Sequence, residues 1–285
     1  MKRSRQHFLA LESFHELLVA STIAESIISV PVAAKAQEAL EIMNQRHFDV
    51  LGLAEEGRIV GYLAKKELED GDDLTESVCG SFKSDFEIMH LVSESCPLED
   101  CISKLGQTER LFLLRSTGID GIITRADLHK QPVRMLLFSV ISLLEMTLLS
   151  LIRKEYADDK GWKTLLCERR LEKAKRLLRE RQDAGMEIDP VDCLQLCDKG
   201  EIIRKTDDLR KQIGFMSKGK CEAFFGHLEK IRNALAHGLA FEAIPNLAWQ
   251  QVFDTFQKAQ EVLKKGIALF DSTETKGPED AESSQ

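Results

Sequence analysis

Tryptophan, tyrosine and proline are scarce in this chain. Its 285 residues include only 2 Trp, 2 Tyr and 6 Pro. Strands of β-sandwiches and barrels are enriched in aromatic residues, so this scarcity favours a helix-rich fold. The hydrophobic content of 43% and charged content of 30% are typical of a soluble globular protein. The length leaves room for two domains, each with its own core.

A cysteine framework is also missing. The seven cysteines are an odd number and are scattered along the chain, which fits reduced thiols in the cytoplasm better than a disulfide-bonded secreted scaffold. No second Cys/His pair stands at zinc-ligand spacing, so we expect no metal site.

Neither a signal peptide nor a membrane span is predicted. The apolar run that should follow the basic N-terminus is interrupted by Glu12, His15 and Glu16, so it contains no hydrophobic signal core. The most apolar segment, residues 133–152, carries Glu145 near its centre, and a charge at mid-membrane costs about 3 kcal/mol. We therefore expect a buried helix there, with enough apolar surface to form a dimer interface.

Charge is unevenly distributed. Residues 1–130 carry a net charge of −8, residues 131–270 carry +4, and the last fifteen residues carry −4. The basic groups that could bind a polyanion therefore lie in the second half.

The first half contains an internal duplication. Helix, strand, turn and strand patterns at 36–43, 48–53, 55–57 and 58–63 return at 97–105, 110–114, 116–118 and 119–123. From the helix start to the glycine of the last strand, the copies span 25 residues (36 to 61) and 24 residues (97 to 121). The match predicts two related α/β units.

Thr124 and Asp127 follow the last strand of the second copy. This pair is typical of a helix cap, but free N–H groups at a helix start also attract phosphate, and a carboxylate one turn on can bind ribose. The doubled unit, with its Gly121-Ile-Ile-Thr124-Arg125-Ala-Asp127 segment, resembles a tandem CBS-domain pair. The resemblance implies that an adenosine nucleotide (AMP, ADP or ATP) binds between the repeats. Gly121 belongs to the family's nucleotide-binding signature, Thr124 and Arg125 would contact phosphate, and Asp127 would bind the ribose. The first copy has Ala64 and Glu67 in the corresponding places, so we expect one working site.

The second half has helical periodicity throughout. We predict helices at about 133–156, 162–183, 190–213, 220–237 and 246–270, followed by a disordered acidic tail at 272–285. In the fourth helix, Phe224, Leu228, Ile231 and Leu235 form an apolar stripe, and at about 100° per residue Asn233 and His237 fall on the opposite face. A structural role is the alternative for both residues. His237 followed by Gly238 is typical of a helix C-terminus, and Arg232 could form an ion pair with Glu229 on the same helix.

Arg232-Asn233-Ala-Leu-Ala-His237 resembles the R-x4–6-H signature of HEPN-domain proteins. The resemblance implies metal-independent RNA cleavage at a site shared by two subunits, with Arg232, Asn233 and His237 as catalytic residues. A basic helix nearby offers Arg169, Lys173 and Arg176 as RNA contacts, although such a helix face is often only solvated. Glu145 needs a buried partner, for which Arg232 is one candidate.

The sequence thus predicts an α+β protein of two domains. These are a tandem CBS (Bateman-type) α/β module at 1–130, with repeats at about 20–70 and 85–130, and an all-α HEPN-like bundle at 131–271. The expected function is that of a cytoplasmic homodimeric endoribonuclease, regulated by adenosine nucleotide, leaving 2′,3′-cyclic phosphate ends and serving a stress or defence response. Two alternatives stay open: a non-catalytic nucleotide sensor, and a HEPN toxin or antitoxin component that needs a separate partner protein.

Overall fold

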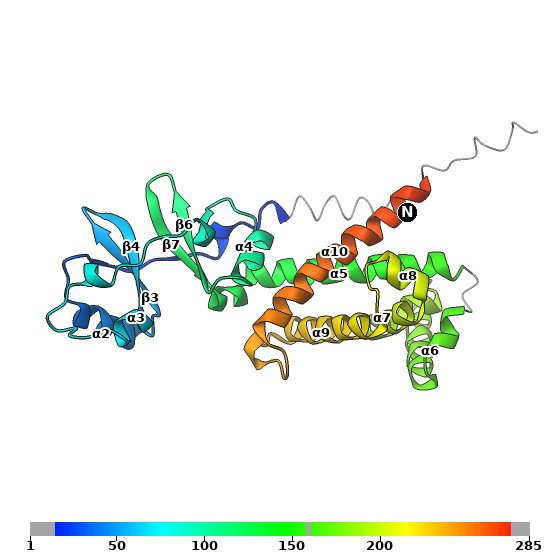
Figure 1. Cartoon of the computed structure of the whole chain (residues 1–285). Helices are drawn as coiled ribbons and strands as arrows, with labels where there is room; N and C mark the ends of the chain where they lie inside the picture. Colours follow the sequence, from blue (N-terminus) through cyan, green and yellow to red (C-terminus); the bar gives the residue numbers. More distant parts are fainter. Residues whose placement is uncertain (1–14, 158–160, 275–285) are drawn as a thin grey trace, which may run out of the picture. The chain divides into compact units, whose positions relative to one another are not determined.

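The computed structural model describes residues 15–157 and 161–274. These residues divide into two compact units, and the division falls after Arg134. The first is an α/β unit and the second is helical (Figure 1), so the predicted α+β class is confirmed. The predicted acidic tail lies outside the described residues from residue 275 onward, while residues 272–274 belong to the last helix.

The α/β unit consists of two repeats with the same order of elements. The first contains β2 (Ser29–Pro31), α2 (Ala36–Arg46), β3 (Val50–Glu55), β4 (Arg58–Ala64) and α3 (Lys65–Glu69). The second contains β5 (Leu91–Ser93), α4 (Leu98–Leu105), β6 (Arg110–Arg115), β7 (Gly118–Thr124) and the 3-10 helix η4 (Arg125–His129). Short 3-10 helices η1 (Ala20–Thr22), η2 (Cys79–Phe82) and η3 (Ile88–His90) lie before and between these elements.

Strand register shows how closely the repeats correspond. In the first repeat β2 pairs parallel with β3, and β3 pairs antiparallel with β4, with Val50 opposite Ala64. In the second, β5, β6 and β7 pair in the same way, with Arg110 opposite Thr124. The paired residues of the second hairpin lie 60 positions after those of the first (50 to 110, 64 to 124). The register of each hairpin shifts at the same place, after Leu53 in the first and after Leu113 in the second. The predicted duplication is confirmed.

The outer edge of each hairpin is closed by the chain that precedes the other repeat. Strand β1 (Glu25–Ser26), which precedes the first repeat, pairs antiparallel with β7 of the second. Ser84, which precedes the second repeat, forms a bridge with Tyr62 in β4 of the first. These pairing segments are too short for any periodicity, so the sequence did not predict them.

The helical unit is built from five longer helices and shorter turns. The long helices are α5 (Gln131–Glu155), α6 (Glu168–Asp183), α7 (Leu196–Lys205), α9 (Lys218–His237) and α10 (Trp249–Glu274). Between them lie η5 (Gly161–Leu165), η6 (Pro190–Cys193), α8 (Asp207–Gln212) and η7 (Phe241–Ala243). Helix α9 packs against both α7 and α10 (Figure 1).

Two predicted helices are interrupted in the structure. The predicted helix at 162–183 is η5 followed by α6, and the one at 190–213 is η6, α7 and α8. The Asp198 carboxylate accepts a hydrogen bond from the Gln195 backbone N–H and starts α7. Thr206 has extended backbone (ψ 96°) and separates α7 from α8. Apolar periodicity alone predicts continuous helices here, and local capping interactions divide them into shorter ones.

Within the described ranges, one helix, α5, has the length and the apolar composition needed to cross a membrane. More than half of its most apolar window is buried inside the structure, and its Glu145 forms ion pairs with α7 and α9. A core helix of a soluble protein passes the same test.

Candidate functional site

The predicted nucleotide residues lie where β7 leads into η4. The Asp127 carboxylate accepts hydrogen bonds from the backbone N–H of Thr124 (2.7 Å) and from its hydroxyl (3.1 Å). Asp127 is only 7% exposed, and its second oxygen is 2.9 Å from the Lys130 ammonium. The segment is a five-residue 3-10 helix rather than an α-helix. Asp127 is therefore a capping residue with both oxygens already bound, and Arg125 is the first residue of η4.

Gly121 lies where strand β1 approaches β7. It lies opposite Ser26 in the β1–β7 pair. A Cβ atom at this position would lie 3.0 Å from the Leu113 Cβ and 3.2 Å from the Glu25 carbonyl oxygen. Absence of a side chain at Gly121 thus allows β1 to approach β7 closely.

The first repeat uses different chemistry at the corresponding positions. Sixty residues before Thr124 and Asp127 stand Ala64 and Glu67. Glu67 accepts a hydrogen bond of 2.7 Å from the hydroxyl of Ser84, so a serine from the segment that pairs with β4 takes the place of a local threonine. Since Ala64 has no hydroxyl, the two copies differ in chemistry at these positions.

Helix α9 presents the Arg–Asn–His motif as the helical wheel predicted. Phe224, Leu228 and Ile231 are buried, whereas Asn233 and His237 are exposed. The helix begins with Ser217, whose hydroxyl accepts from the Lys220 N–H (3.2 Å). It ends at Gly238, whose φ of 68° is the left-handed conformation that favours glycine. His237 is in the last turn of the helix and faces solvent, so it is not a core histidine.

Arg232 has partners that the sequence only partly indicated. Its Nη1 donates to the Asn233 side-chain oxygen at 3.1 Å, and its Nε lies 3.8 Å from Oε1 of Glu145. The other oxygen of Glu145 is 3.0 Å from the ammonium of Lys199. The pairing of Glu145 with Arg232 is confirmed, whereas the pairing of Arg232 with Glu229 has no counterpart in the structure.

Lys199 was missed because nothing in its neighbourhood marks it as buried. It lies in α7 with a side chain only 8% exposed. A lysine is almost never this buried unless it is paired. The signal that could have found it is Glu145, a lone carboxylate in an apolar helix that requires a cation.

A cleft of about 710 Å³ lies between α6 and the η6–α7 turn and reaches α9. Its basic lining residues are Arg169, Arg170, Lys173, Arg176 and Arg179, and its acidic ones are Glu172, Asp198 and Glu229. All three residues predicted as RNA contacts line it. They stand on one face of α6, at positions i, i+4 and i+7.

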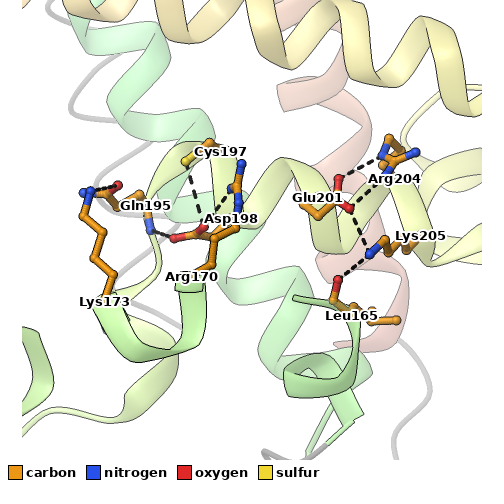
Figure 2. Close-up of polar contacts among 9 residues, drawn as sticks. All are labelled: Leu165, Arg170, Lys173, Gln195, Cys197, Asp198, Glu201, Arg204 and Lys205. Atoms are coloured by element: carbon orange, nitrogen blue, oxygen red, sulfur yellow. Dashed lines mark hydrogen bonds and ion pairs between the residues drawn. The ribbon is translucent and has the colours of Figure 1, made fainter. Parts of the chain in front are cut away.

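Specific contacts hold the wall of this cleft together (Figure 2). Arg170 donates to Asp198 at 2.8 Å, and the Lys173 ammonium donates to the side-chain oxygen of Gln195 at 3.0 Å. The cleft is also lined by Cys197. Burial raises the pKa of the Cys197 thiol, so this group is neutral at physiological pH.

The predicted ribonuclease and nucleotide residues are thus in different units, and we describe each site by itself. Among the residues described, no group of three His, Cys, Asp or Glu side chains is arranged to hold a metal ion. All seven cysteines are free thiols.

Comparisons with known proteins give matches to solved structures only. No protein-family model and no curated protein matches the chain. A conserved CBS-domain protein of Thermoplasma acidophilum is 20% identical, with a TM-score of 0.35, and the match covers 42% of this chain and 75% of that one. CBSX2 of Arabidopsis thaliana, a CBS-pair protein, is 18% identical over 39% of this chain and 90% of its own, with a TM-score of 0.34. A second CBSX2 structure, in complex with AMP, is 19% identical, covers 39% and 92% and has a TM-score of 0.34.

Proposed function

We propose that this protein is a metal-independent endoribonuclease of the HEPN type, active as a homodimer and regulated by an adenosine nucleotide. One observation carries the RNA-cleaving part. Glu229, where the basic cleft reaches α9, lies one turn before Asn233 and two turns before His237 on one face of the helix. These separations are about 6 Å and 12 Å along the axis. A strand held in the cleft would therefore continue directly onto the Asn233–His237 face.

The residue types suit cleavage within an RNA strand. His237, exposed at the helix end, would accept the proton of a ribose 2′-hydroxyl as its oxygen forms a bond to phosphorus. The guanidinium of Arg232 would stabilise the charge that develops on the phosphorane oxygens. The bond from phosphorus to the 5′-oxygen then breaks, and the His237 of a second subunit would protonate that oxygen. The products are a 2′,3′-cyclic phosphate and a 5′-hydroxyl.

Asn233 would act on Arg232 rather than on His237. Its side-chain oxygen accepts from Arg232 Nη1 at 3.1 Å, while Glu145 lies beside Nε. These two contacts orient the guanidinium. Arg232 is 34% exposed, which leaves part of the side chain accessible to an RNA phosphate.

For the α/β unit we propose one adenosine-nucleotide site at Gly121, Thr124, Arg125 and Asp127. Two observations support it: the duplicated architecture, and a carboxylate buried directly after β7. Both Asp127 oxygens already accept hydrogen bonds or pair with Lys130. Ribose hydroxyls would have to replace Lys130, so nucleotide binding would release this lysine and the Glu25 side chain that it also contacts.

The experiment is cleavage of a labelled mixed-sequence RNA in EDTA. The wild type is compared with His237→Ala and with Asp127→Asn, each with and without AMP or ATP. We expect cyclic-phosphate ends from the wild type, none from His237→Ala, and from Asp127→Asn cleavage that no longer responds to nucleotide. AMP is included because the CBSX2 complex holds it.

A second function, that of a non-catalytic nucleotide sensor, is favoured by one observation. Arg232 is already engaged by Asn233 and Glu145, as a purely structural arginine would be. Nucleotide binding without RNA cleavage, under any nucleotide, would establish this second function and exclude the first.

A further inference from the structure

Three basic side chains of the cleft take no part in the close ion pairs of the described residues. Arg169, Lys173 and Arg179 line the cleft and are exposed. Among the residues that the structure describes, no carboxylate forms an ion pair with any of them. From Arg169 to Arg179 they extend over eleven residues of α6, or about 15 Å along the helix axis, which is long enough to contact several phosphates of one strand.

Two of the three acidic side chains that line the cleft, Asp198 and Glu172, are paired with basic ones, and the third is Glu229 on α9. Asp198 is paired with Arg170 at 2.8 Å, and its side chain is only 6% exposed. Glu172 is 2.7 Å from the ammonium of Lys175, which lies outside the cleft. With five basic and three acidic side chains, the lining has a positive formal charge, although the whole protein carries a net charge of −8.

The cleft has no aromatic ring on which a base could stack. Its lining contains no Phe, Tyr, Trp or His, the side chains whose rings stack on unpaired bases. Its lining groups other than charged ones are Gln195 and the thiol of Cys197, and Gln195 already accepts from Lys173. An elongated anion with repeated charges fits this lining, which offers no aromatic ring to a base.

We infer that this cleft binds the phosphodiester backbone of a nucleic acid strand and leaves the bases outside. Contacts to phosphate carry no sequence information, so binding is independent of sequence and nearly the same for RNA and DNA. The inference deepens the proposed ribonuclease function and rests on it only for the direction of the strand toward His237. Cleavage would then be selected by the 2′-hydroxyl at His237 and not by the cleft.

Single-stranded DNA allows a test that does not depend on cleavage, because it lacks the 2′-hydroxyl. We would measure fluorescence anisotropy of labelled dA, dT and dC twelve-mers, and of the matching RNA with the His237→Ala background, at several salt concentrations. The test variant is Arg169→Ala, Lys173→Ala, Arg179→Ala. Its matched control is Lys211→Ala, Lys220→Ala, Lys264→Ala, which removes the same charge from exposed lysines that do not line the cleft.

We expect the wild type and the control to bind all oligonucleotides with similar affinity. The test variant should bind about 10- to 100-fold more weakly, since three solvent-exposed ionic contacts are lost. The slope of log affinity against log salt should become shallower by about 2, at about 0.7 per lost contact on a single strand.

Three results would overturn the inference: equal affinity of the test and control variants, a tenfold preference among the bases, or equally effective competition by a polyglutamate peptide of the same charge. Binding that depends on the cleft, in a wild type that cleaves no RNA, would support the inference and refute only the proposed nuclease activity.

Discussion

Arg232→Ala separates a catalytic arginine from a structural one, because the structure predicts different effects on stability and on activity. The Arg232 side chain is 34% exposed, and its Nε is 3.8 Å from Glu145. An ion pair this exposed and this long contributes about 0.5 kcal/mol to the free energy of unfolding. For a unit of this size, that loss lowers Tm by about 2 °C.

Lys199→Met is the comparison. The Lys199 side chain is 8% exposed, and its ammonium is 3.0 Å from the Glu145 carboxylate. Removing one partner of a fully buried ion pair costs about 3–5 kcal/mol. Because Glu145 is 25% exposed and keeps the longer contact to Arg232, we expect a smaller loss of about 2 kcal/mol, or about 7 °C in Tm.

The assay is thermal unfolding followed by circular dichroism, paired with RNA cleavage on the same samples. We expect Arg232→Ala to abolish cleavage and leave Tm nearly unchanged, and Lys199→Met to lower Tm while retaining cleavage below its transition. A fall in Tm for Arg232→Ala as large as that for Lys199→Met would refute this reasoning and make Arg232 a structural residue.

Two further predictions concern the helical unit. Hydrogen bonds from Arg204, together with those from Lys205, lower the pKa of Glu201 to about 2 from an ordinary value of 4.5. Because the pKa of Glu201 is lower in the folded than in the unfolded state, the ionised carboxylate stabilises the fold by about 2 kcal/mol. This stabilisation is complete above pH 4.5 and is lost as the pH falls toward the pKa of about 2 in the folded state. Urea unfolding should therefore show wild type and Glu201→Gln differing most at neutral pH and converging on acidification; a constant difference would contradict this. Gly200→Ala should destabilise by about 1–3 kcal/mol, since its Cβ would lie 2.6 Å from the Phe225 ring, whereas nothing lies within 4 Å of a Cβ at Gly226. Gly226→Ala should stabilise the protein by about 0.5–1 kcal/mol through helix propensity. If both variants shift the midpoint of chemical unfolding equally, the packing of α7 on α9 is not what makes Gly200→Ala destabilising.

The duplication, the positions of most strands and helices, and the exposed face of α9 followed from the sequence. Each depends on local periodicity. Short apolar runs mark β6 and β7 and turn residues separate them. The buried residues Phe224, Leu228 and Ile231 place Asn233 and His237 on the other side of α9 by helix geometry alone. The three predicted RNA contacts on α6 share a face for the same reason.

Tertiary structure decided what those residues touch. Lys199 and Glu145 are 54 residues apart in the sequence, and only the packing of α7 against α5 brings their charges together. The β1–β7 and Ser84–Tyr62 pairings join segments that are distant in sequence and too short to show a period. The basic helix became one wall of a cleft because the η6–α7 turn and α9 supply the others. Contacts of this kind depend on which surfaces the fold buries together, and no local pattern in the sequence encodes that choice.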